Sequence, residues 1–504
     1  MIDKINSVIG VGKFHKLFIF SLINCSYLTC FLSLSFSYLT KQPQFLCKEN
    51  SEQNYEKCVF KEDKFCSVET NSFEYIKDKS NSLDNWSYNF DLYCSNKKYI
   101  VLIGSGFFIG AIFGCIVITP LPDKYGRKIV LKIFLTISCI LHFLILTSFN
   151  PLFLSMICIT SGFVSAIYGN FSLYVAEYIP KESSAIAMSF IDAVYPFMGF
   201  LEALYFLTIN NWRLLFLFTT LIHIISTFFI LKYLPESPKW LYSKGKINEA
   251  IEVMKQIATI NGKENEVQTF LNLNGEQLND NKEENENNKE NNVTDNNNSF
   301  NNIISILIKY PSQRLLIFIL AFTFFCASYC FYGIILSLEN MKGNFFVNSF
   351  LSFFGEMTAE LLSGYLSGIY GRTTILKFGG IVGAFGFLGN QLCPYNLKSI
   401  LLLVAMMGYS STFNVLYIYT PEIIPSSIRS TVSGALYFCG MGAPSFVPFF
   451  KAIIPGTFEV LFIIFGFAYS IACFRLPETL GKEINDELPE ERQEKQENLL
   501  LENN

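Results

Sequence analysis

The chain has 504 residues and a formal net charge of −4; 51% of its residues are hydrophobic and only 16% are charged. Its mean hydropathy is +0.34. These values exclude an ordinary soluble protein of this length and predict one that crosses a lipid bilayer several times. The net charge says little about partners because most charged residues fall in two polar segments, and no nucleic-acid-binding pattern is present.

An apolar helix of about 20 residues crosses a hydrocarbon core of about 30 Å. Twelve stretches of suitable length predict an all-α membrane protein with twelve transmembrane helices. They are 14–39, 99–119, 129–148, 151–175, 185–209, 212–234, 314–338, 345–369, 373–392, 399–419, 429–450 and 456–475.

Lysine and arginine predict the orientation, because short cytoplasmic loops are enriched in them. If both ends are cytoplasmic, the short inner loops carry Lys124, Arg127, Lys128, Lys181, Arg372, Lys377 and Arg429. We therefore expect cytoplasmic termini at 1–13 and 477–504, and a multi-pass protein of the plasma membrane. The lysine-rich loop 40–98 would then be extracellular, and loops this long translocate regardless of charge.

The predicted outer loop also carries four of the 14 cysteines, Cys47, Cys58, Cys66 and Cys94. An oxidising outer face would permit two disulfides, with three possible connectivities, and four free thiols are the alternative. Asn85-Trp86-Ser87 is an acceptor sequence for a glycan in the same loop.

A polar segment divides the chain between its sixth and seventh apolar stretches. Residues 235–312 contain an amphipathic piece, "INEAIEVMKQIATING", followed by Asn- and Glu-rich sequence that cannot bury a core. We interpret 235–312 as a cytoplasmic linker between two six-helix halves, 14–234 and 313–476.

The two halves repeat the same motifs. "TPLPDKYGRKIVL" after the second stretch matches "GYLSGIYGRTTIL" after the eighth, and "YVAEYIPKESSA" matches "YTPEIIPSSIRS". Parallel repeats of this kind enclose a midplane site in one class of transporters. The motifs predict gating residues that pair across helix ends; the alternative is that their cations only fix the topology. The gating candidates are Asp123, Gly126, Arg127, Lys128, Glu177, Arg372, Glu422 and Arg429.

These motifs carry a resemblance to a known family. "DLYCSNKKYIVLIGSGFFIGAIFGCIVITPLPDKYGRKIVL" resembles the second span and gating loop of the major facilitator superfamily, in its organic cation/anion/zwitterion transporter family (solute carrier family 22). "LPESPKWLYSKGKINEAIEVMKQIATING" and "LPETLGKEI" are similar to that family's sequences after spans six and twelve. The resemblance implies two six-helix pseudo-repeats that transport a small organic solute.

Three positions depart from the family pattern. Thr119 stands where the gating loop usually begins with glycine, Gly368 replaces the acidic residue of the second copy, and Ser184 replaces an arginine that the second copy keeps as Arg429. These changes weaken the gating contacts expected in the first half. They leave a non-transporting solute receptor as an alternative function.

Two carboxylates lie deep in the eighth apolar stretch. Glu356 is about 16 Å from the start of the stretch, counted at about 1.5 Å per residue, and Glu360 is on the same helix face one turn later. A carboxylate at that depth should face a watery cavity or a partner. In the family, Glu356 matches a usually acidic position and Glu360 a position that is lysine in anion-transporting members. The pair therefore favours a cationic solute. The alternative is that hydroxyls such as those of Thr358 and Ser363, or a neighbouring helix, satisfy the two acids.

Further intramembrane residues are candidates for the solute site. Tyr329 and Tyr332 are one turn apart in the seventh stretch, where their rings could face a cation. Met441 occupies a position that is aspartate in cation-transporting relatives and arginine in anion-transporting ones. In the fifth stretch, Glu202 is a site candidate and Asp192 is favoured for gating or structure. His142 and His223 are interpreted as structural.

The sequence contains no nucleotide-binding loop and no His or Cys cluster, so we expect neither an enzyme nor a metal or cofactor. Transport would draw on gradients, and the membrane potential alone favours cation uptake. The predicted function is secondary transport of small organic cations by alternating access. Zwitterions, organic anions or sugars are the alternative substrates, and the oligomeric state remains open.

Overall fold

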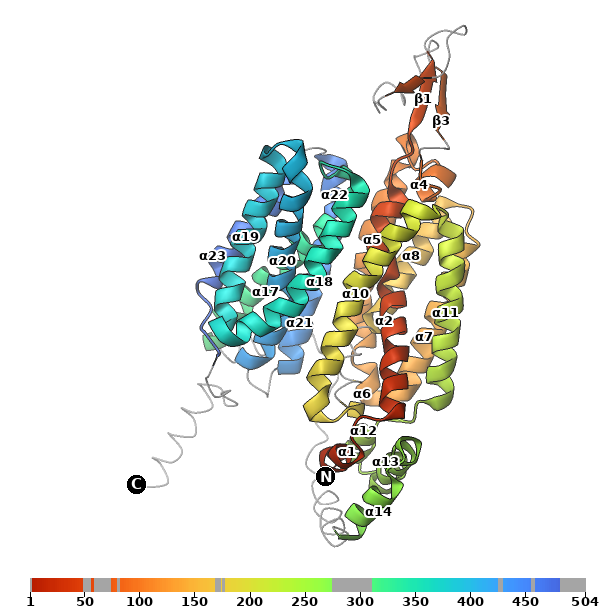
Figure 1. Ribbon diagram of the computed structural model, residues 1–504, viewed down its shortest axis with the longest axis vertical. Coiled ribbons are helices and arrows are strands. Elements are labelled where there is room, and N and C mark those ends of the chain that lie inside the picture. Colours follow the sequence, from red (N-terminus) through yellow and green to blue (C-terminus); the bar gives the residue numbers. More distant parts are fainter. Residues whose placement is uncertain are drawn as a thin grey trace.

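The computed structural model describes residues 2–48, 56–58, 74–78, 82–167, 174, 177–273, 311–424, 429–454 and 458–480. Two bundles of helices stand side by side (Figure 1). The first contains α2 (Lys13–Thr40), α5 (Lys97–Ile118), α7 (Arg127–Leu146), α8 (Pro151–Ser165), α10 (Lys181–Thr208) and α11 (Trp212–Tyr233). The second contains α17 (Pro311–Leu336), α18 (Phe345–Tyr370), α19 (Arg372–Leu392), α20 (Tyr395–Ile423), α21 (Arg429–Gly442), α22 (Phe446–Ile453) and α23 (Val460–Cys473).

Shorter elements cover the two ends of the bundles. At the end that we call the sheet end lie β1 (Phe45–Lys48), β2 (Glu56–Cys58), β3 (Glu74–Lys77), α4 (Trp86–Asn89) and the 3₁₀ turns η1 (Cys94–Asn96) and η3 (Leu338–Asn340). At the opposite linker end lie α1 (Ile2–Ile9), α6 (Leu121–Tyr125), α12 (Pro238–Ser243), α13 (Ile247–Asn261) and α14 (Glu264–Leu273). The turn η4 (Ala443–Ser445) joins α21 to α22.

The long helices coincide with the predicted apolar stretches. Within the described residues, seven helices are long and apolar enough to cross a membrane. The other five predicted stretches overlap α2, α8, α10, α18 and α23. Asparagine side chains at Asn150, Asn211 and Asn344 cap the first turns of α8, α11 and α18, which explains where these helices begin. The twelve-span count itself stays a prediction.

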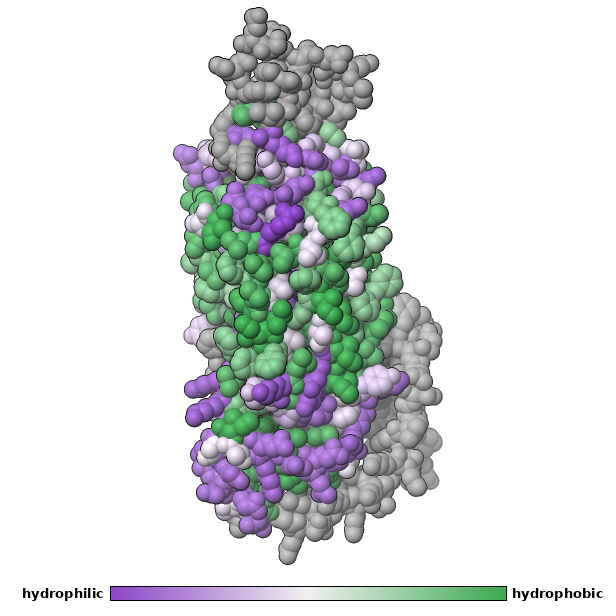
Figure 2. Space-filling view, turned by 90° about the vertical axis from the view of Figure 1, so that its right-hand side faces the viewer, coloured by the Kyte–Doolittle hydropathy of each residue, from purple (hydrophilic) through white to green (hydrophobic). Residues whose placement is uncertain are grey.

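On the face shown in Figure 2, an apolar belt lies between two polar ends. On α11, for example, Phe218, Leu221 and Phe228 are exposed, whereas Thr219 and His223 on the other faces are buried. Apolar side chains outside and polar ones inside are the reverse of a soluble bundle and suit a lipid environment. The protein is a multi-pass membrane protein.

The loop at the sheet end forms a small antiparallel sheet in the order β2-β1-β3. Cys94, in η1, is disulfide-bonded. Cys47 and Cys58 lie on paired strands without described side chains, and Cys66 lies outside the described residues. The connectivity of the four cysteines therefore remains a prediction.

The prediction of a glycan at Asn85 does not agree with this fold. Asn85 is fully buried at the start of α4. Its Nδ2 atom, to which a glycan would be attached, donates hydrogen bonds to the carbonyl oxygens of Tyr38 (2.7 Å) and Lys41 (2.9 Å). Its Oδ1 atom accepts from the Tyr88 N–H. The side chain fastens the loop to the end of α2, which sequence alone could not reveal.

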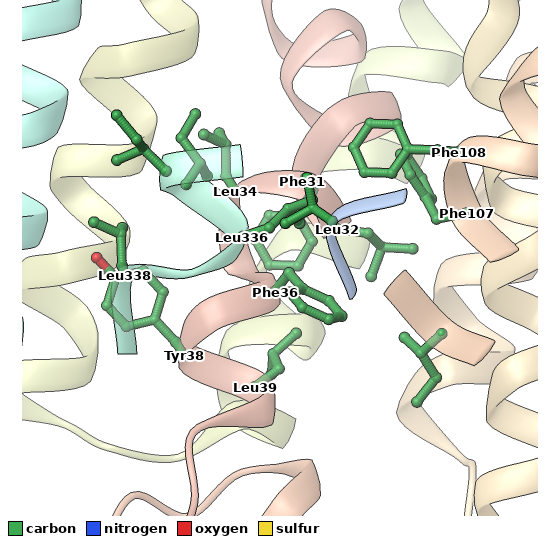
Figure 3. Packing of buried hydrophobic residues seen from close by; sticks show 14 of the residues in the cluster. Phe31, Leu32, Leu34, Phe36, Tyr38, Leu39, Phe107, Phe108, Leu336 and Leu338 are labelled. Carbon is green, nitrogen blue, oxygen red and sulfur yellow. The ribbon is translucent and has the colours of Figure 1, made fainter. Parts of the chain in front are cut away.

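Within the described residues, the two halves share a hydrophobic core toward the sheet end. One buried cluster combines residues of both halves, and there Leu336 and Leu338 from the second half approach Leu34, Phe36 and Tyr38 of α2 (Figure 3). The other two clusters of described residues each belong to one half. The cluster of the first half includes α1, α13 and α14, so the linker helices are part of that half's core.

Candidate functional site

Helix α18 carries both predicted acids along a stripe that faces the other half. It packs against α10 of the first half and α20 of its own half. The Phe353 ring would lie 2.5 Å from a Cβ atom at Gly199 of α10, so Phe353 faces α10 closely. Glu356 and Glu360 follow Phe353 by three and seven residues and therefore continue the same helix face.

The carboxylate of Glu356 is buried without a partner among the residues that the structure describes. The residue is 0% exposed, and neither Oε1 nor Oε2 has a hydrogen-bond partner among the described residues. An ionised, unpaired carboxylate in a low-dielectric interior costs several kcal/mol. This conformation therefore favours a protonated Glu356 or a bound cation at this position.

Glu360 extends the acidic region across the interface. Its side chain interacts electrostatically with Glu356 and with Asp192 of α10, and its Oε2 atom lacks a partner. Asn414 of α20 donates to the backbone carbonyl of Glu360 (3.2 Å) and to the hydroxyl of Ser363 (3.0 Å), so it fixes the helix without neutralising an acid. The hydroxyls considered from the sequence do not satisfy the pair; Thr358 donates to the carbonyl of its own helix at Gly355.

The structure separates the two predicted tyrosines. Tyr329 is fully buried within the second half, between the rings of Phe462 and Phe465 on α23, with centroid distances of 5.6 and 4.8 Å. Tyr332 instead faces the first half, with its ring centroid 5.4 Å from that of Phe108. The structure does not agree with the prediction that Tyr329 lines the solute site. The two side chains leave the helix in different directions, and only that of Tyr332 points toward the other half.

Glu202 and Met441 do not join the acids of α18. Glu202 is 2% exposed and accepts a hydrogen bond of 2.7 Å from the Ser35 hydroxyl, so it links α10 to α2 inside the first half. Met441 is half-buried near the end of α21, the helix that packs on α5.

Aromatic residues that the sequence did not single out lie at the interface. Phe413 of α20 packs against Tyr332 (5.9 Å) and Tyr417 (5.2 Å). Tyr417 also interacts electrostatically with Asp192 of the other half. With 52 Phe and 26 Tyr in the chain, no sequence pattern distinguishes these rings from those that face lipid.

The first Gly-Arg motif forms an ion-pair network at the linker end around the buried pair Arg127 and Glu177. Arg127 donates from Nε and Nη2 to Glu177, with distances of 2.8–3.0 Å, and its Nη1 lies 2.7 Å from Asp123. Glu236, in the "LPESP" sequence, accepts from the backbone N–H groups of Arg127 (2.8 Å) and Lys128 (3.0 Å) at the start of α7. We call these side chains the first latch.

The second motif builds an equivalent second latch. Arg372 donates to Glu422 at 3.1–3.4 Å, and Glu478, in "LPETL", accepts from the N–H groups of Arg372 (2.8 Å) and Thr373 (3.0 Å). Burial raises the pKa of Glu478, but hydrogen bonds from the Thr373 hydroxyl and from backbone N–H groups outweigh it and leave the pKa below its ordinary value. Thr479 also donates to Glu422 (2.6 Å).

A glycine at the same place in each motif makes both latches possible. Gly126 and Gly371 have φ angles of +103° and +97°, a region that favours glycine. A Cβ atom there would lie 2.5 Å from Glu236 and 2.6 Å from Glu478, respectively. The predicted turn at Gly126 is thus present, and its tightness brings each glutamate onto the following helix.

The departures from the family pattern fall partly within the described residues. Gly368 lies four residues before Arg372, as Asp123 does before Arg127, and a Cβ atom at Gly368 would meet nothing nearer than the Arg372 guanidinium at 3.7 Å. Thr119 ends α5. The side chains of Ser184 and Arg429 lie outside the described residues, so the predicted role of Arg429 stays a prediction.

The two histidines of the first half contact each other. The ring centroids of His142 (α7) and His223 (α11) are 5.0 Å apart, and His142 Nδ1 is 3.0 Å from the Ser138 carbonyl. Among the described residues, no three His, Cys, Asp or Glu side chains gather in a way that could hold a metal ion.

Comparison with known proteins places the chain among transporters. The chain is similar to organic cation/carnitine transporter 4 of Arabidopsis thaliana (25% identity, 84% of this chain and 78% of the relative). It is also similar to solute carrier family 22 member 15-like of Xenopus tropicalis (29%, 78% and 79%) and to organic cation/carnitine transporter 2 of Homo sapiens (27%, 81% and 74%). This similarity confirms the predicted resemblance.

Solved structures confirm the fold. The inward-open xylose transporter XylE from E. coli superposes with a TM-score of 0.62 at 14% identity, covering 96% of this chain and 98% of that one. The family model of the Major Facilitator Superfamily matches residues 86–448. That family and fold are those of membrane transporters rather than enzymes. The chain belongs to the Major Facilitator Superfamily.

Proposed function

We propose that this protein is a secondary transporter that moves small organic cations across the plasma membrane by alternating access. The observation that carries the proposal is the fully buried carboxylate of Glu356, which no described side chain pairs with or neutralises. Glu360 and Asp192 add negative charge, and no lysine or arginine in the described part of the chain contributes to the electrostatics of either α18 glutamate. The names of two relatives, organic cation/carnitine transporters, support the same solute class.

In this proposal a cation replaces the missing partner. The solute's positive charge binds Glu356 and Glu360, and its apolar groups contact Tyr332, Phe108 and Phe413, whose ring faces attract cations by about 0.5–2 kcal/mol each. Because Glu360 lies on one half and Asp192 on the other, a bound cation would draw the halves together. In this proposal the linker end of the protein faces the cytoplasm.

The latches keep each half rigid while access to the site alternates between the two sides of the membrane. Arg127 and Arg372 each bind acids of their own half, so either half can rotate as one body. Access from the sheet end then requires the shared core around Leu336 and Phe36 to separate.

Uptake by vesicles reconstituted with the full chain tests the proposal. Labelled tetraethylammonium, carnitine, benzoate and xylose are compared in the wild type, Glu356→Gln and Glu360→Gln. We expect saturable tetraethylammonium uptake that falls at least tenfold in Glu356→Gln, which corresponds to a loss of about 1.4 kcal/mol or more. Cation uptake at the wild-type level in both variants would rule out the proposed role of these acids. Saturable binding without flux would indicate a receptor.

A further inference from the structure

Two buried serines near the acids of α18 leave their hydroxyl groups unsatisfied. Ser352 of α18 is 0% exposed and Ser410 of α20 is 2% exposed. Neither Oγ atom has a hydrogen-bond partner among the residues that the structure describes. Their neighbours Ser349 and Ser411 instead donate to carbonyl oxygens of their own helices, each at 2.8 Å. Because a buried hydroxyl without a partner costs free energy, the first two serines call for a partner outside the described chain.

The register of α18 and α20 brings both serines close to Glu356. Two hydrogen bonds between these helices, one near the start of α18 and one past its middle, join residues that are 51 and 54 positions apart in the sequence. The two helices therefore run in the same direction, and the same separations place Ser410 opposite residues 356–359. Ser410 also lies one turn before Asn414, on the face of α20 that contacts α18. Ser352 lies one turn before Glu356 on the same face of α18.

The serines and the acids together form a set of polar atoms that positive charge alone would not satisfy. Both carboxylate oxygens of Glu356, the Oε2 atom of Glu360 and the two serine Oγ atoms have no hydrogen-bond partner in the described part of the chain. An ionised carboxylate only accepts hydrogen bonds, whereas a hydroxyl can accept or donate. A quaternary ammonium group has no N–H and would leave these oxygens without donors. A primary ammonium group supplies three donors, and hydrogen bonds between charged groups are the stronger ones.

We propose that Ser352 and Ser410 make the solute site around Glu356 selective for primary ammonium groups over quaternary ammonium groups of the same charge. The bound ammonium donates to the Glu356 carboxylate and to the serine hydroxyls. A buried site built to hydrogen-bond its ligand rejects an analogue that lacks the donor, because the polar groups of the site are then left unpaired. This selectivity deepens the proposed function and rests on it.

Equilibrium binding to the purified full chain tests the selectivity with labelled benzylammonium and benzyltrimethylammonium, which share a ring and a charge but differ in their N–H groups. We expect the wild type to bind benzylammonium about tenfold more tightly or better. With Ser352→Ala and Ser410→Ala combined, this preference should fall about fivefold or more, because only benzylammonium loses hydrogen bonds. Ser349→Ala and Ser411→Ala combined are the matched control and should keep the preference, since those hydroxyls are satisfied within their own helices. Thermal unfolding verifies that each variant is folded.

Equal wild-type affinity for the two ligands, or an unchanged preference without the hydroxyls of Ser352 and Ser410, would overturn the inference. Tighter binding of benzyltrimethylammonium in that variant, with benzylammonium unaffected, would also overturn it, because the serines would then exclude the larger group by size. Glu356→Gln separates this inference from the proposed function. If it weakens both ligands while the wild type does not distinguish them, the cation site stands and only the role of the serines fails. Binding of neither ligand to the wild type at millimolar concentration would overturn both.

Discussion

Carboxylates in two regions of this protein, withdrawn fully or partly from water, have opposite surroundings. At the linker end, Glu177, Glu236, Glu422 and Glu478 each accept hydrogen bonds from an arginine side chain or from the backbone at a helix start. On α18, Glu356 is buried, and no described residue pairs with its carboxylate. Removing a carboxylate from water costs free energy in both regions. Only at the linker end do hydrogen bonds within the chain offset this cost.

The difference separates structure from function. A carboxylate that the fold satisfies strengthens the fold, whereas one that the fold leaves unsatisfied persists only if something outside the chain uses it. Replacing a glutamate by glutamine should therefore destabilise the protein at the latches but leave its stability unchanged on α18.

The largest loss of stability is expected for Glu177→Gln. The side chains of Arg127 and Glu177 are 8% and 9% exposed, and removing one charge of a buried pair costs about 3 kcal/mol or more. A thiol-reactive dye that detects the buried cysteines on heating measures the shift in unfolding temperature. Asp123→Asn is the control, because Asp123 is 69% exposed and should matter little; an equal shift in both variants would contradict a buried latch.

Glu422→Gln should destabilise the protein less. The side chains of Arg372 and Glu422 are 19% and 26% exposed, their contacts are longer than those of the first latch, and loss of a charged hydrogen bond there should cost about 1.5 kcal/mol. The same thermal assay compares the two halves directly. A larger shift than that of Glu177→Gln would reverse the order of the two latches.

Gly368→Asp should strengthen the second latch. The new side chain enters open space beside Arg372 and supplies the acid that Asp123 provides in the first half, for a gain of about 0.5 kcal/mol. Raised salt should erase the gain, because the pair is near the surface. Gly368→Asn serves as the uncharged control; an equal gain there would indicate helix propensity instead of charge.

The smallest effect on stability is expected for Glu356→Gln. The substitution removes a charge that has no partner, so the unfolding temperature should stay the same or rise slightly. The dye assay on the purified protein again supplies the measurement. A loss comparable to that of Glu177→Gln would show that Glu356 has a structural partner.

Local sequence patterns predicted the features that depend on neighbouring residues. The length of the apolar stretches located the long helices, and the repeated Gly-Arg motif located both turns and both arginines. The roles of Glu236 and Glu478 were not predicted, because each binds a helix start more than 100 residues away in the sequence. The directions of Tyr329 and of the Asn85 side chain were missed for a similar reason: both depend on packing between segments that only the fold brings together.

Cation binding to the purified full chain tests the central claim most directly. Glu356 and Glu202 are both buried intramembrane acids, but the Ser35 hydroxyl satisfies only Glu202. The account predicts that Glu356→Gln weakens the binding of labelled tetraethylammonium at least tenfold, whereas Glu202→Gln leaves it unchanged. Wild-type affinity in Glu356→Gln would contradict it.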